Sequence, residues 1–100
     1  IEETYVNKNY GSSLKLAHAR SAAILTLSLS SLKPIEYSAK TIKKTLVGSG
    51  GAEKQQVMNM LNLLMPGIKI SSKDASDAVA IAVCHSRFYR PTAHLNIANF

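Results

Sequence analysis

The sequence predicts a single α/β domain with a partly parallel sheet. Segments rich in strand-forming residues alternate with segments whose apolar residues recur at helical spacing. The chain has 100 residues, the size of one domain, and 46% of them are hydrophobic while 18% are charged. This composition is typical of a globular protein and excludes the disordered and collagen-like classes.

Three segments are predicted to be extended. Residues 1–6 contain Ile, Thr, Tyr and Val, which favour strands, and residues 34–38 form a short strand with Pro34 at its edge. Residues 68–70 form a brief apolar stretch between two helical segments. No turn or capping residue comes before the first strand. We therefore expect the chain to begin inside a strand and to lack the part of the domain that precedes it.

Four segments are predicted to be helical. The first begins at Ser12 or Ser13 and runs to about Ser30, and the others cover residues 38–47, 52–65 and 71–89. The first helix carries apolar residues around most of its circumference, which is typical of a helix buried on more than one side. In a chain of this length we expect a partner subunit or a missing sheet to cover it.

The chain is basic, with twelve Lys and Arg residues against six Asp and Glu, which gives a net charge of +6. This excess indicates a polyanionic partner, either nucleic acid or a membrane surface. The one cysteine cannot form an internal disulfide, which favours a reducing, cytoplasmic compartment. No stretch is apolar for long enough to cross a bilayer, and no leader indicates secretion.

Four of the six acidic residues fall into two groups, Glu2 with Glu3 and Asp74 with Asp77. Residues three apart on a helix point to one side, whereas strand alternation lets only one glutamate join the same pocket. Carboxylates held together repel unless a cation lies between them, and oxygen ligands favour Mg²⁺. The alternative is that these acids stabilise a helix N-terminus, which explains Asp74 better than Asp77 because Asp77 lies further inside the helix.

The glycine-rich residues 48–51 come just before a helix, where a phosphate oxygen can bind. The segment lacks the Gly-Lys-Ser/Thr ending of a nucleotide P-loop, so ATP is not the expected ligand. Lys40, Lys43, Lys44 and Lys54 flank it, and a basic cluster at a glycine turn fits a nucleic-acid backbone. The alternative is a flexible turn with solvated lysines.

Cys84 and His85 are not expected to act as a nucleophile and its base. Adjacent helical residues point about 100° apart, and Cys84 lies among Ala, Val and Ile, which indicates a small buried hydrophobe. His85 has the helical offset to lie on the side of Asp74 and Asp77, where it could support the acidic site. One cysteine and three scattered histidines do not show zinc-ligand spacing.

Four motifs in this order resemble the RuvC family of crossover-junction endodeoxyribonucleases: IEETYVNKN, SLKLAHAR, KKTLVGSGGAEKQQV and DASDAVAIA. The resemblance covers residue 1 to about residue 85. It implies an RNase H-like, retroviral-integrase-type fold that lacks its first strands, with a mixed sheet flanked by helices. Residues 1–89 would then be the C-terminal portion of one nuclease domain and residues 90–100 a tail.

The resemblance also implies a function. Members of this family are homodimers that resolve four-way Holliday junctions by two symmetric nicks, with the RuvA–RuvB branch-migration complex as a partner. Two Mg²⁺ ions, with Mn²⁺ as a substitute, would activate water at each site. The resemblance places the catalytic, metal-binding acids at Glu2, Asp74 and Asp77. It places the DNA-contacting residues at Tyr5, Lys43 and Lys54. A fourth acid, an aspartate on the first strand of the fold, would precede residue 1.

Because one ligand would be missing, we expect the 100-residue chain alone to be poorly folded or inactive. Two other functions remain open. In the first, the chain is a non-catalytic basic DNA-binding domain whose carboxylates only cap helices. In the second, it is a helical interaction module joined through the first helix. Metal-dependent nicking would exclude the first alternative, and salt-sensitive junction binding would exclude the second.

Overall fold

The structure is a computed structural model that describes residues 1–5 and 7–89. It contains four helices, whose bounds are α1 (Tyr10–Leu29), α2 (Ala39–Val47), α3 (Lys54–Leu64) and α4 (Lys73–Phe88). All four predicted helices are confirmed, with ends shifted by a few residues. Val6 of the predicted first strand and the predicted tail, residues 90–100, lie outside the described residues.

Local capping explains where three of the helices begin or end. Ser38 caps α2 by accepting a hydrogen bond from the Thr41 N–H at 3.1 Å, and Gly48 ends the helix in the left-handed conformation with φ of 90°. Ser72 caps α4 through the Ala75 N–H at 3.1 Å. Helix α1 starts earlier than the expected Ser12 or Ser13 because Asn9 is its cap: the side-chain oxygen of Asn9 accepts from the Ser12 N–H.

The predicted α/β class is wrong, because the described residues form four helices and no strand. The RNase H-like mixed sheet is therefore not observed. Within residues 1–5 and 7–89, extended pairing is limited to one parallel bridge between Glu2 and Tyr37. It is flanked by 2.9 Å hydrogen bonds from Glu3 N to Tyr37 O and from Tyr37 N to Ile1 O. Side-chain propensity only indicates a half-buried extended surface, whereas a sheet needs several paired neighbours. Pro34, which has no N–H to donate, adds no pairing.

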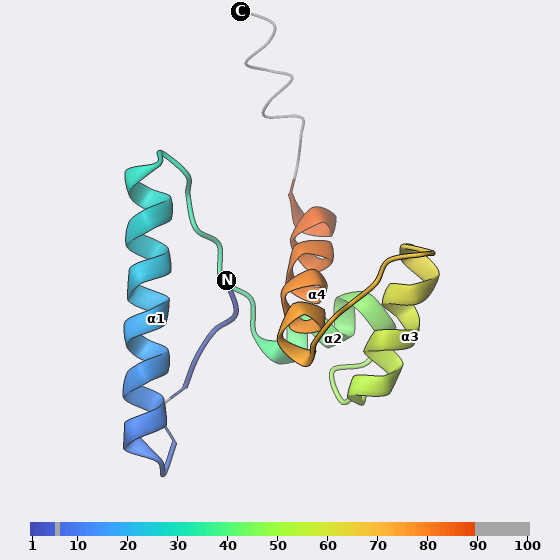
Figure 1. The fold of residues 1–100 in the computed structure, drawn as a ribbon, viewed down its shortest axis with the longest axis horizontal. Coiled ribbons are helices and arrows are strands. Elements are labelled where there is room, and N and C mark those ends of the chain that lie inside the picture. The colour runs from blue at the N-terminus through green and yellow to red at the C-terminus, as the bar shows by residue number, and fades with distance from the viewer. Residues whose placement is uncertain (6, 90–100) are drawn as a thin grey trace, which may run out of the picture.

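The core lies between α2, α3 and α4, which pack against one another (Figure 1). Its buried residues are Tyr37, Ile42, Leu46, Leu61, Ala80 and Cys84. Leu61 and Cys84 are completely buried, and Cys84 is a free thiol. The interpretation of Cys84 as a small buried hydrophobe is therefore confirmed. This three-helix group is the framework on which the candidate site is built.

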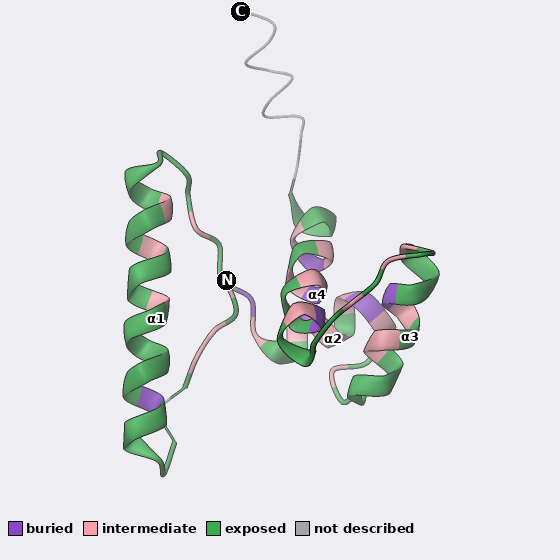
Figure 2. Cartoon of the chain, viewed as in Figure 1, coloured by how far each residue is buried: buried purple, intermediate pink, exposed green. Residues whose placement is uncertain are grey.

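Helix α1 stands apart from this group and packs against none of the other three helices (Figures 1 and 2). Its one buried residue is Ser13, and its leucines are largely exposed, with Leu29 at 78%. Arg20 pairs with Glu36 of the connector that follows α1. The expected burial of α1 on more than one side is not met within the chain, and cover by a partner subunit stays a prediction. No helix among the described residues has both the length and the apolar character to cross a bilayer.

Candidate functional site

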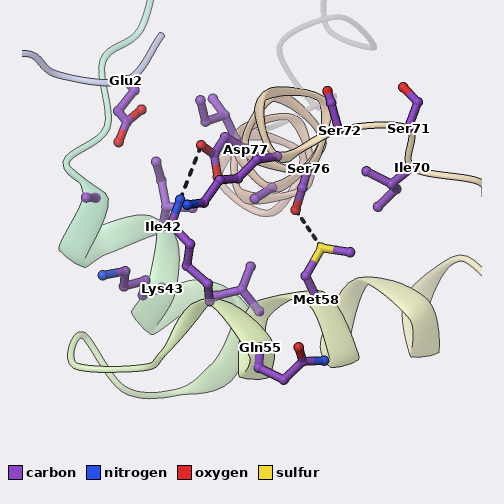
Figure 3. Close-up of a pocket in the computed structure, with 16 residues that line it drawn as sticks. Glu2, Ile42, Lys43, Gln55, Met58, Ile70, Ser71, Ser72, Ser76 and Asp77 are labelled. Atoms are coloured by element: carbon purple, nitrogen blue, oxygen red, sulfur yellow. Dashed lines mark hydrogen bonds and ion pairs between the residues drawn. The ribbon is translucent and has the colours of Figure 1, made fainter.

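A cavity of about 510 Å³ lies where the N-terminal segment, α2, α3 and the start of α4 meet (Figure 3). Aliphatic side chains, including Ile42, Val57 and Ile81, form one part of its wall. The charged and hydroxyl-bearing residues that line it are Glu2, Lys43, Lys54, Lys73, Asp77, Ser71, Ser72 and Ser76. The cavity therefore combines an apolar wall with groups that recognise charge.

Two of the three predicted acids line this cavity from different parts of the chain. Glu2 comes from the N-terminal segment and Asp77 from the second turn of α4 (Figure 3). Glu3, the neighbour of Glu2, does not line the cavity. Asp74 does not line it either and lies in the first turn of α4, where the helix dipole favours a negative charge.

The donor chemistry of the cavity fits Mg²⁺ only in part. Carboxylate oxygens are the ligands that Mg²⁺ prefers, and the ion is often held by one or two carboxylates together with waters and substrate phosphates. Glu2 and Asp77 supply two carboxylates on one cavity. Across residues 1–5 and 7–89, however, no group of three or more His, Cys, Asp or Glu side chains is placed to hold a metal ion. These residues provide a partial ligand set.

The two predicted DNA-contacting lysines line the same cavity as the two acids. Lys43 comes from α2, and Lys54 is the first residue of α3. The Lys54 ammonium Nζ lies 3.9 Å from Asp77 Oδ2, and the two side chains are 62% and 51% exposed. Such an exposed pair is weak because water and salt screen it. Lys54 therefore occupies a position in which it competes with any cation that approaches Asp77.

Tyr5 lies outside the cavity, on the same segment as Glu2. The residue is 68% exposed, and its hydroxyl donates a 2.6 Å hydrogen bond to Glu3 Oε2. This hydrogen bond, followed by the negative charge of Glu3 and slight desolvation, raises the pKa of Tyr5. The exposed ring remains accessible for stacking.

The glycine-rich residues 48–51 form the turn between α2 and α3 and do not line the cavity. Gly48 has the positive φ that ends α2. Gly50 lies against the stem of Lys40, where an added Cβ would come within 2.7 Å of Lys40 Cγ. The geometry of this segment is that of a tight turn, and the phosphate-binding interpretation stays untested.

Some relevant residues carry no motif that sequence reasoning could recognise. Ser76 Oγ lies 2.7 Å from the sulfur of Met58, and both residues line the cavity. His85 does not line the cavity but forms a 2.7 Å hydrogen bond through Nδ1 with the Tyr37 hydroxyl. This pair joins residues 48 positions apart. The position of Lys73 at the cavity could have been predicted, because Lys73 lies four residues before Asp77 on the same helix and such residues share one side.

The cavity therefore brings carboxylates and lysines from the N-terminal segment, α2, α3 and α4 together around one hollow. Comparison with known proteins identifies the family of this chain. A family model described as "Crossover junction endodeoxyribonuclease RuvC" matches residues 1–85. The chain therefore belongs to the RuvC family.

Individual relatives with the printed name "Crossover junction endodeoxyribonuclease RuvC" are similar over most of the chain. The protein from Gluconobacter oxydans is 48% identical over 95% of this chain and 56% of its own length. The protein from Acidiphilium cryptum is 48% identical over 86% of this chain and 52% of its own length. The protein from Rhodospirillum rubrum is 44% identical over 98% of this chain and 58% of its own length. The chain thus spans just over half the length of these relatives.

Proposed function

We propose that the protein containing this chain is a metal-dependent endonuclease that resolves four-way Holliday junctions by paired symmetric nicks, in DNA recombination and repair. Membership of the RuvC family supports this function. The observation that carries it is the cavity in which Glu2 and Asp77 lie together with Lys43 and Lys54. Carboxylates for a divalent cation and ammonium groups for phosphates are the two chemistries that the reaction requires.

In the proposed mechanism, the acids of the cavity hold the metal and the lysines hold the DNA. Glu2 and Asp77 contribute carboxylate oxygens, and Asp74, three residues before Asp77 on α4, stays the proposed third ligand. A further carboxylate from outside these residues would complete the set. Two bound Mg²⁺ or Mn²⁺ ions would supply an activated water and stabilise the leaving oxygen of the phosphodiester.

Lys43 and Lys54 position the DNA backbone by contacting phosphates, which fixes the strand without reading its sequence. When a phosphate reaches Lys54, the Lys54 ammonium leaves the Asp77 carboxylate and binds the phosphate oxygen instead. The Asp77 carboxylate is then available to the cation. Tyr5, with its ring exposed beside the segment that carries Glu2, stacks on an unpaired base near the junction centre.

Paired nicks require two active sites, so we propose a homodimer with α1 at the interface. The support is that several leucines are exposed on a helix that no other helix of the described chain covers. The RuvA–RuvB complex is the proposed partner and the cytoplasm the proposed compartment, both by family resemblance. Because the described residues contain no group of three metal-binding side chains, we propose that the 100-residue chain alone is inactive.

The decisive experiment substitutes one acid at a time in the whole natural protein. Asp77→Asn and Glu2→Gln are each expected to lower Mg²⁺-dependent cleavage of a four-way junction by about 100-fold or more, because each removes a metal ligand. Junction binding in metal-free buffer is expected to stay within about two-fold, since both lysines remain. Glu3→Gln is the matched control, because Glu3 is the neighbouring acid that does not line the cavity. Cleavage by Asp77→Asn at the unaltered rate would contradict the metal-site assignment.

A non-catalytic basic DNA-binding domain is the second candidate. Its support is the position of Asp74 in the first turn of α4, where a carboxylate stabilises the helix without any ligand. Titration of Mg²⁺ and Mn²⁺ into the whole protein with junction DNA separates the two functions. Binding that weakens with salt but gives no nicking at any metal concentration would favour this candidate.

A further inference from the structure

Tyr37 connects the segment that carries Glu2 to the rest of the chain through its backbone. Its N–H donates to Ile1 O and its carbonyl accepts from Glu3 N–H, both at 2.9 Å, so that Glu2 lies at the centre of the bridge. The terminal ammonium of Ile1 adds a 2.9 Å hydrogen bond to Ile35 O. In the described part of the chain, every hydrogen bond from residues 1–5 to another segment therefore ends on residues 35–37.

The side chain of Tyr37 connects the 35–37 segment to α4. Its hydroxyl forms a 2.7 Å hydrogen bond with Nδ1 of His85, which lies eight residues after Asp77 on α4. The Tyr37 ring also stacks on Phe88 with ring centroids 5.6 Å apart, and the residue is only 8% exposed. Breaking this hydrogen bond would leave the Tyr37 hydroxyl desolvated and without a partner, which costs free energy. Burial raises the pKa of Tyr37 above its ordinary value.

We propose that Tyr37 and His85 are positioning residues that set the separation of the Glu2 and Asp77 carboxylates. Neither residue lines the acidic cavity, so both act through the elements they join. The hydrogen bond fixes the 35–37 segment on α4, and the backbone bridge carries that constraint to Glu2. The inference rests on the proposed function to the extent that the two carboxylates bind one metal centre.

The test uses Tyr37→Phe in the whole natural protein, because this substitution removes the hydroxyl and keeps the ring on Phe88. The matched control is Tyr89→Phe, which removes the hydroxyl of a second, 53% exposed tyrosine whose ring also contacts His85. In metal-free protein we expect Tyr37→Phe to speed hydrogen exchange at the Glu3 and Tyr37 amides by about three- to ten-fold. The amides of α3 are expected to exchange at the unaltered rate.

The second readout is the Mn²⁺ concentration that gives half-maximal junction cleavage. Tyr37→Phe is expected to raise it by a similar factor of about three to ten, with an unchanged junction Kd. His85→Leu should raise the half-maximal Mn²⁺ concentration as Tyr37→Phe does. His85→Asn should raise it much less, since the Asn amide places a polar atom near the position of Nδ1. A merely structural role would lower the folded fraction and the maximal rate without moving the half-maximal Mn²⁺ concentration.

The outcomes separate this inference from the proposed function. If Tyr37→Phe behaves as Tyr89→Phe in both readouts, the positioning role is overturned. A lower maximal rate at an unchanged half-maximal Mn²⁺ concentration overturns it as well. If the unaltered protein shows no Mn²⁺-dependent cleavage, the proposed function fails and the link to the carboxylates fails with it. The exchange rates then still decide whether Tyr37 anchors the N-terminal segment.

Discussion

Lys54 is expected to have opposite effects on the two ligands proposed for the cavity. Its ammonium attracts a phosphate, but it also lies 3.9 Å from Asp77 Oδ2 and so competes with a cation there. Lys54→Met removes the charge and keeps most of the apolar stem. We therefore expect this variant to bind DNA more weakly and to bind metal more tightly in the absence of DNA.

The size of both effects follows from the geometry. Two unit charges at this separation attract by about 1 kcal/mol in bulk water. With 62% and 51% of the two side chains exposed, screening reduces the expected range to about 0.2–1 kcal/mol. Removal of the ammonium should thus lower the metal Kd by about 1.4- to 5-fold. Loss of one phosphate contact should reduce the slope of log K against log salt by about 0.9.

Calorimetric titration of Mn²⁺ into the whole natural protein without DNA measures the first effect. Anisotropy of a labelled four-way junction at a series of salt concentrations measures the second. The control is Lys43→Met, because Lys43 lines the same cavity but forms no ion pair within residues 1–5 and 7–89. It should lose a similar salt slope and change the Mn²⁺ affinity less than Lys54→Met does.

Two results would refute this reasoning. If Lys54→Met binds Mn²⁺ with unchanged or lower affinity, the ammonium does not compete with a cation at Asp77. If the salt slope is unchanged, Lys54 does not contact a phosphate of the bound junction. Tighter metal binding together with a reduced slope is the expected pair.

Three further predictions concern stability and assembly. Leu61→Ala should lower the free energy of unfolding by about 2–5 kcal/mol in urea denaturation, because Leu61 is fully buried. Leu63→Ala should lower it much less, because Leu63 is 74% exposed. Gly48→Ala should cost about 1–2 kcal/mol in the same assay because of its φ of 90°, while Gly51→Ala, without a positive φ, should be nearly neutral. Leu29→Glu on α1 should shift the sedimentation coefficient of the whole protein toward that of a monomer; an unchanged dimer would exclude this part of α1 from the interface.

The helices could be predicted because their signals are local. Ser38 and Gly48 delimit α2 within its own sequence, and Ser72 does the same for the start of α4. The predicted sheet is not found in the described residues. Strand formation depends on paired neighbours, which the propensity of a segment does not reveal. Residues 1–5 and 34–38 do approach each other in parallel, but only through the bridge between Glu2 and Tyr37.

The site was predictable where periodicity and family resemblance agree. Strand alternation allowed only one of Glu2 and Glu3 into the pocket, although no strand forms among the described residues. The family resemblance selected Glu2 and paired it with Asp77 across the length of the chain. Helical offset placed His85 on the side of Asp77, but it could not show that His85 lies beyond the cavity and meets Tyr37. A contact between residues 48 positions apart leaves no spacing signal in a single sequence.

The structure also separates the elements that build the cavity from the element that would build a dimer. Helices α2, α3 and α4 bury the core and hold Lys43, Lys54 and Asp77. Among the described residues, the one buried residue of α1 is Ser13, and most of its leucines are exposed. The connector after α1 joins the two parts: Glu36 pairs with Arg20 of α1, and the next residue, Tyr37, holds the segment of Glu2. That ion pair is about one third exposed on each side, so it contributes little rigidity. The connector is therefore held weakly at α1, whereas residues 35–37 at its other end are held by backbone and side-chain hydrogen bonds.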